Sequence, residues 1–80
     1  MDSLTAARQR AVGTKQVTRA VEKGTALTVY VARDAESHVT RHLLALCRQH
    51  GVQVVEVDSM RALGRACGVE VGAASAAILK

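Results

Sequence analysis

Aromatic residues are almost absent from this sequence: Tyr30 is the only one, and there is no Phe, Trp or proline. Proteins that bind single-stranded nucleic acid by base stacking normally use several aromatic side chains, so that mode of binding is disfavoured. No apolar run approaches the ~20 residues that span a bilayer, and no signal peptide is recognisable. We therefore expect a cytoplasmic protein without a membrane partner.

Cysteine is also scarce, and the two cysteines lie far apart. Cys47 and Cys67 lack the short spacing of zinc-binding or redox-active pairs. We interpret them as reduced residues packed like small apolar side chains. His38 and His42 have an i, i+4 spacing that can bind a metal, but no nearby carboxylate completes a convincing site. We interpret them as exposed helix residues and expect no metal and no cofactor.

The length of the chain, 80 residues, predicts one domain over residues 1–80. A domain of this size buries only about 60% of its unfolded surface, which favours a binding module over an enzyme with a substrate pocket. Cys47 and Ser59 have no arrangement with acid or base residues that supports nucleophilic catalysis. The Gly13-Thr14-Lys15 segment lacks the GxxxxGK spacing of a P-loop. We expect no enzymatic activity.

Positive charge is concentrated in the first third of the chain. The formal net charge is +4, and residues 1–24 contain five basic residues against two acidic ones, so most of the excess lies there. Such an excess favours polyanionic partners. Charge alone predicts only weak, salt-sensitive binding.

Helical and strand patterns alternate along the chain without a linker or repeat. Expected strands are 10–12, 27–32, 52–57 and 73–79. A first helix is expected from Leu4, Ala7 and Ala11 after a Ser3 cap, and a second over 15–23. A third is expected from an inward stripe of Val39, Leu43, Leu46 and Cys47. A fourth is expected after Ser59 through Ala66, with Gly68 past its end. This alternation predicts an α/β fold, a three-layer α/β/α sandwich with a mixed sheet of about four strands. Segment 73–79 could instead be helical, because alanine favours helix.

The strongest candidate site begins at Gly13, followed by a helix. Glycine lets the backbone approach a ligand closely, and the N–H groups at a helix N-terminus suit phosphate. Lys15, Arg19 and Lys23 recur at i, i+4 and i+8, so they share one face. Lys15 and Gln16 at the tip could reach the edges of bases. The residues alone leave an ordinary solvated helix face as an equal alternative.

Several short motifs occur in an order that resembles a known family. Together they are similar to the kink-turn-binding ribosomal proteins of the L7Ae family, and specifically to its small bacterial branch. The motifs are Gly13-Thr14-Lys15-Gln16, Thr18-Arg19-Ala20-Val21, Lys23-Gly24, Val29-Tyr30-Val31-Ala32-Arg33-Asp34-Ala35, Leu63-Gly64-Arg65-Ala66-Cys67-Gly68 and Val69-Glu70-Val71-Gly72-Ala73-Ala74.

The resemblance implies an α/β/α sandwich that recognises the kink-turn, a sharply bent RNA helix with tandem sheared G·A pairs. It implies that Gly13–Arg19 enters the RNA and reads guanines, and that Val69–Val71 covers an extruded nucleotide. Lys15 and Gln16 stand where archaeal members usually carry Asn and Glu, which leaves the affinity and the individual base contacts open. Gln16 can still meet a guanine edge, because an amide both donates and accepts hydrogen bonds.

Two further segments keep alternative interpretations. The valines of Val69-Glu70-Val71 could contact a splayed base or fill the edge of the core. Arg33, at a strand end, could bind phosphate, although a plain surface charge is the simpler interpretation.

We therefore expect a monomeric protein that binds structured RNA in the ribosome, a riboswitch or another ribonucleoprotein, and not DNA. The alternative is a protein–protein interaction module of a ribonucleoprotein with little specific RNA affinity. The expected RNA-binding residues are Gly13, Thr14, Lys15, Gln16, Thr18, Arg19, Lys23, Arg33, Val69, Glu70 and Val71.

Overall fold

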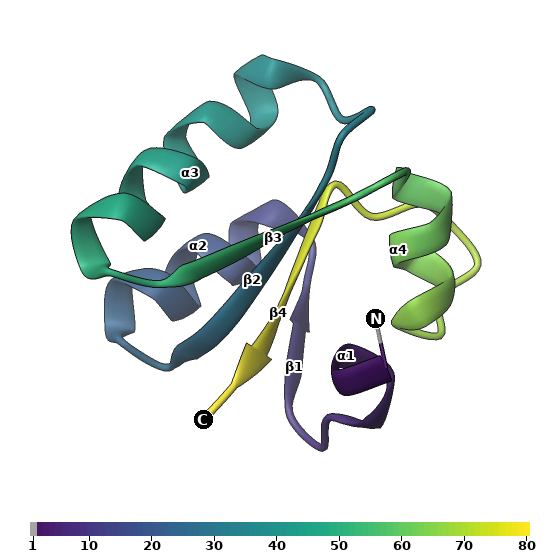
Figure 1. Ribbon diagram of the computed structural model, residues 1–80, viewed down its shortest axis with the longest axis horizontal. Helices are drawn as coiled ribbons and strands as arrows, with labels where there is room; N and C mark the ends of the chain where they lie inside the picture. The colour runs from purple at the N-terminus through teal and green to yellow at the C-terminus, as the bar shows by residue number, and fades with distance from the viewer. Residues whose placement is uncertain (1) are drawn as a thin grey trace.

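The computed structural model describes residues 2–80, in which helices and strands alternate (Figure 1). The helices are α1 (Asp2–Ala6), α2 (Thr14–Lys23), α3 (Ser37–His50) and α4 (Met60–Ala66). The strands are β1 (Arg10–Val12), β2 (Ala26–Ala32), β3 (Gln53–Val57) and β4 (Ser75–Leu79). No helix within this range is long and apolar enough to cross a membrane.

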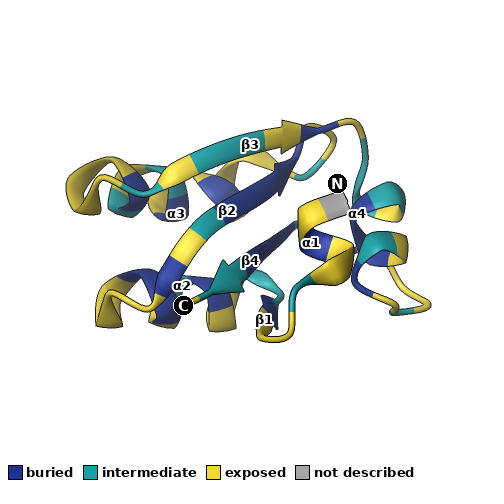
Figure 2. Ribbon diagram, turned by 60° about the horizontal axis from the view of Figure 1, so that its bottom comes forward, coloured by how far each residue is buried: buried dark blue, intermediate teal, exposed yellow. Residues whose placement is uncertain are grey.

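The strands form one mixed sheet in the order β1-β4-β2-β3. Strand β2 pairs in parallel with β3, whereas β4 is antiparallel to both β1 and β2. Helices α2 and α3 cover one face of the sheet and α1 and α4 cover the other (Figures 1 and 2). The predicted three-layer sandwich with a four-stranded mixed sheet is therefore confirmed.

The core consists of two apolar clusters, one on each side of the sheet. Val29 and Val31 of β2 face the cluster beneath α2 and α3, whereas Tyr30 and Ala32 face the cluster beneath α1 and α4. Successive strand side chains point to opposite faces, so a strand covered on both faces needs a continuous apolar run. This explains why the sequence of β2 does not alternate with polar residues.

Strand β4 confirms the preferred prediction for the Ala-rich segment. Ala76 and Ala77 are both fully buried, with helices on both faces of the sheet. Ala77 pairs with Ala11 of β1 on one side and with Val29 of β2 on the other. Small side chains here let both helical layers pack closely, so tertiary pairing overrides the helical propensity of alanine.

Local details of the helices agree with the sequence in part. Ser59 caps α4, since its Oγ accepts a hydrogen bond of 3.0 Å from the Ala62 N–H, and Gly68 has the expected positive φ of 74°. The expected first helix was too long: α1 ends at Ala6, Ser3 lies inside it, and Ala11 belongs to β1. Val39, which was expected to face the core, is exposed, and the neighbouring Thr40 is buried in its place.

The two cysteines are free and buried on opposite sides of the sheet. Burial raises the pKa of the Cys47 thiol. Burial also raises the pKa of the Cys67 thiol, with a smaller opposing effect from the positive charge of Arg10. Both residues therefore pack as small apolar side chains, as the sequence predicted.

Candidate nucleic-acid interface

One end of the sandwich gathers the segments that the sequence singled out. Backbone hydrogen bonds join Gly13 N–H to the Ser75 carbonyl at 2.9 Å and Ala32 N–H to the Ala74 carbonyl at 2.9 Å. Arg33 N–H donates to the Val57 carbonyl at 2.8 Å. The start of α2, the ends of β2 and β3 and the loop before β4 thus lie at the same end of the sheet, as the chain path in Figure 1 shows. We call this end, with segments 13–16, 33–37, 58–59 and 69–74, the loop edge.

The N-terminus of α2 presents unpaired backbone donors at the loop edge. Gly13 has φ 95° and ψ 145°, a backbone conformation that glycine adopts without steric cost. The first helical hydrogen bond is from Val17 N–H to the Gly13 carbonyl at 3.0 Å, so the N–H groups of residues 14–16 precede it. There is no side-chain cap and no acidic residue in the first turn. The partial positive charge of this helix end therefore remains available to an anion.

The predicted division of α2 into two faces is observed. Val17, Ala20 and Val21 are buried against the sheet. Lys15, Gln16, Arg19 and Lys23 are exposed, whereas Thr14 and Thr18 are half-buried. The three basic side chains form no ion pair with any side chain from residues 3 to 80. Lys15 lies at the loop edge, but Lys23 is eight residues further along the helix, about 12 Å away.

The loop of residues 69–74 lies on α4. Val69 N–H donates to the Gly64 carbonyl and Ala73 N–H donates to the Met60 carbonyl, both at 3.0 Å. A Cβ at Gly64 would collide with the backbone carbonyl oxygen of Val71. The absence of a side chain at position 64 is therefore what lets the loop approach the helix. Our sequence reasoning missed this role, although a glycine inside a helical pattern was a usable signal.

The two valines of this loop differ in their surroundings. Val71 is 74% exposed, one of the few large apolar side chains that stand in solvent. Val69 is half-buried and packs against the cluster beneath α1 and α4. Glu70 between them is exposed. Val69 therefore fills the edge of the core, as one interpretation expected, whereas contact of the exposed Val71 with a base stays a prediction.

Arg33 and the histidines form contacts at the protein surface. Arg33 Nε lies 3.2 Å from Glu56 Oε2, and both side chains are more than 60% exposed. Exposed ion pairs of this kind contribute little stability, and such an arginine can exchange its partner for a phosphate. His38 Nδ1 lies 3.2 Å from Glu36 Oε2, and His42 is exposed. Within the described residues, no group of three His, Cys, Asp or Glu could hold a metal ion.

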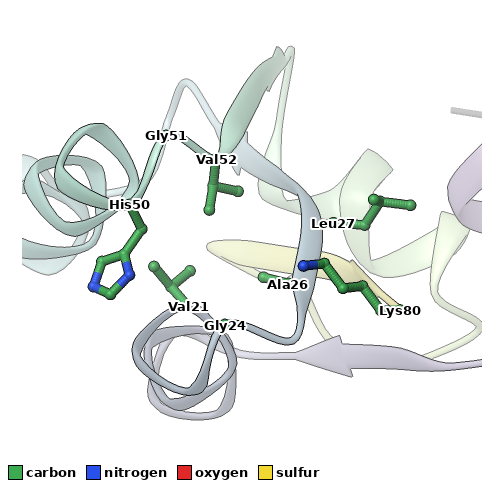
Figure 3. A pocket seen from close by; sticks show the side chains of 8 residues that line it. All are labelled: Val21, Gly24, Ala26, Leu27, His50, Gly51, Val52 and Lys80. Atoms are coloured by element: carbon green, nitrogen blue, oxygen red, sulfur yellow. The ribbon is translucent and has the colours of Figure 1, made fainter.

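Two grooves, each of about 260 Å³, mark opposite ends of the molecule. The one at the loop edge lies between the start of α3 and the ends of β2 and β3, with Arg33 and Glu56 on its border. The other lies between the C-terminal ends of α2 and α3, with His50, Lys80 and the exposed Leu27 at its border (Figure 3). The second groove brings together none of the predicted site residues.

The structure is a small α/β/α sandwich with a basic helix end and an exposed valine at one edge, and comparison with known proteins shows the family to which it belongs. The chain matches the Ribosomal protein L7Ae/L30e/S12e/Gadd45 family over residues 2–80. The chain therefore belongs to this family, as the motifs indicated.

Individual relatives extend the comparison. An RNA-binding protein of Caldanaerobacter subterraneus is 45% identical over 69 residues, which cover 86% of this chain and 84% of that protein. An RNA-binding protein of Bacillus pumilus is 40% identical over 78 residues, which cover 98% and 95% of the two chains. The solved structure of the Giardia lamblia 15.5kD RNA binding protein matches with a TM-score of 0.87 and 33% identity. That match covers 96% of this chain and 65% of the Giardia chain.

Proposed function

We propose that this protein binds RNA at the loop edge and recognises a kink-turn. The observation that carries the proposal is the placement, at one edge, of the uncapped α2 N-terminus with exposed Lys15 and Gln16 and of the exposed Val71. The names of the bacterial relatives and of the Giardia protein, all RNA-binding, support the same class of partner. The role is binding rather than catalysis.

The proposal assigns a different interaction to each part of the edge. The N–H groups of residues 14–16 and the side chain of Lys15 bind phosphates at the edge, and Arg19 and Lys23 bind phosphates further along the exposed face of α2. Lys15 and Gln16 contact guanine edges exposed where the G·A pairs open the groove. Val71 packs on an extruded nucleotide, for which an apolar side chain in solvent is suited. The remaining proposed contacts are Gly13, Thr14, Thr18, Arg33, Val69 and Glu70.

The decisive experiment compares two RNAs of the same length and charge. One carries a kink-turn, and in the other the G·A pairs are replaced by Watson–Crick pairs. We expect tighter binding of the kink-turn in gel-shift or calorimetric titrations at fixed salt, because only the bent RNA presents guanine edges and an extruded nucleotide together. Equal affinity for the two RNAs would leave only general electrostatic attraction and refute the proposal.

The proposal includes association with the ribosome, a riboswitch or another ribonucleoprotein. Crosslinking in cells followed by RNA sequencing tests this part.

The alternative is a protein–protein module with little specific RNA affinity. The exposed Leu27 beside the groove at the end opposite the loop edge favours it as a second candidate. A salt-insensitive protein complex, together with unchanged Gly13–Arg19 NMR signals on addition of RNA, would support that alternative.

A further inference from the structure

The hydroxyl groups of Thr14 and Ser75 link the start of α2 to the first residue of β4, which follows the 69–74 loop. Thr14 Oγ1 lies 3.0 Å from Ser75 Oγ, across 61 residues of sequence. Ser75 is fully buried, one of two buried polar residues in the described part of the chain. A buried hydroxyl is costly to leave without a partner, so Ser75 favours the arrangement in which Thr14 lies beside it.

The two hydroxyls occupy the positions that connect α2 with the loop. Thr14 is the first residue of α2 and directly precedes Lys15. Ser75 directly follows the loop of residues 69–74, and its carbonyl oxygen accepts the Gly13 N–H at 2.9 Å. One buried residue therefore holds the start of α2 by its side chain and by its backbone.

The first turn of α2 is held on its inner side by the buried Val17 but has no side-chain cap. Gly13 provides no side chain that could fix the direction of the helix start. The ladder between β1 and β4 ends at the pair of Val12 and Ala76, before the helix begins. The hydroxyl pair is therefore a side-chain link between the helix start and β4 that lies beyond the ladder.

We propose that the Thr14–Ser75 hydroxyl pair positions the N-terminus of α2 relative to the 69–74 loop, so that Lys15, Gln16 and Val71 meet an RNA as one rigid unit. Ser75 is then a positioning residue for RNA specificity, because a fully buried side chain cannot itself touch the RNA. This inference rests on the proposed function of the loop edge.

The test uses the full chain and four single variants. Ser75→Ala and Thr14→Val remove one hydroxyl of the pair, whereas Thr14→Ser keeps it. Thr25→Val is the matched control, since it removes a hydroxyl that donates to the Ala20 carbonyl at 3.2 Å near the opposite end of α2. Each variant is titrated with the kink-turn RNA and with the RNA lacking G·A pairs.

We expect Ser75→Ala and Thr14→Val to weaken kink-turn binding roughly fivefold, which is about one neutral hydrogen bond. The affinity for the RNA without G·A pairs should not change, because no charge is removed. The specificity ratio should therefore fall in these two variants and remain at the wild-type value in Thr14→Ser and Thr25→Val. A wild-type ratio in both Ser75→Ala and Thr14→Val would overturn the inference. Thr14 is itself a proposed RNA contact, so if Ser75→Ala does not fold, the exchange rate of the Val17 N–H in Thr14→Val, measured without RNA, decides it.

Amide hydrogen exchange separates this inference from the proposed function, because it needs no RNA. In Ser75→Ala, the Val17 N–H, which bonds to the Gly13 carbonyl, should exchange faster. The Leu63 N–H of α4, which bonds to the Ser59 carbonyl, should exchange at the wild-type rate. Unchanged exchange at Val17 would refute the positioning role even if kink-turn binding is demonstrated.

Discussion

Replacing Gly64 by alanine tests the close approach of the 69–74 loop to α4. The new Cβ would collide with the Val71 carbonyl oxygen, and it would lie 3.2 Å from the Val71 carbonyl carbon and from Gly72 Cα. These are backbone atoms, which cannot turn aside as the end of a side chain can. The loop must therefore move away from the helix.

The stability change of Gly64→Ala is the sum of two opposing effects. Overpacking of this kind costs typically about 1–3 kcal/mol. Alanine in place of glycine within a helix stabilises by about 1 kcal/mol. We therefore expect a net loss of roughly 0–2 kcal/mol in the free energy of unfolding, measured by urea denaturation. Displacement of Val71 should also weaken kink-turn binding by more than the loss of stability explains.

The helix effect can be measured separately in the same helix. Arg65 is exposed, so the difference between Arg65→Ala and Arg65→Gly reports helix propensity in α4 without a loop contact. If Gly64→Ala stabilises the protein by this full amount and binds kink-turn RNA normally, the inferred loop–helix contact is wrong.

Three further predictions concern Lys15, Gln16 and the two cysteines. Lys15→Ala should weaken binding to all RNAs and reduce the slope of log affinity against log salt by about one, whereas Lys80→Ala, which removes the same charge at the opposite end, should change neither. Gln16→Ala should reduce discrimination between the two RNAs by roughly 1–3 kcal/mol, and a wild-type ratio would exclude a base contact. Burial raises the pKa of both cysteine thiols, so the folded state keeps them protonated at pH values where the unfolded state ionises. The free energy of unfolding should therefore fall as the pH rises past 9.0, the ordinary pKa of a thiol. A free energy of unfolding that is level from pH 8 to pH 10, both in the wild type and in a Cys47→Ala, Cys67→Ala double variant, would contradict this.

Local chemistry was sufficient to predict most elements of the fold. The apolar face of α2 and its glycine stop at Gly24 follow from helical periodicity and from the left-handed conformation, φ 76°, that glycine adopts there. The nearly continuous apolar run of β2, broken by Thr28, indicated a strand covered on both faces, and Ser59 indicated the start of α4. These features depend on residues within a few positions of one another, so their patterns are visible in the sequence. The family motifs also indicated which segments form the candidate site.

Only the tertiary structure decided how the parts of that site meet. Sequence spacing did not distinguish Val69 from Val71, because burial of Val69 depends on where the loop crosses α4. The Ala-rich segment became a central strand because Ala11 and Val29 pair with it from either side, against its own propensity. The Thr14–Ser75 pair joins residues 61 positions apart, and the close contact between Gly64 and the Val71 carbonyl exists only once the loop lies on the helix. Contacts between distant segments arise from packing of the whole chain, and no local pattern encodes them.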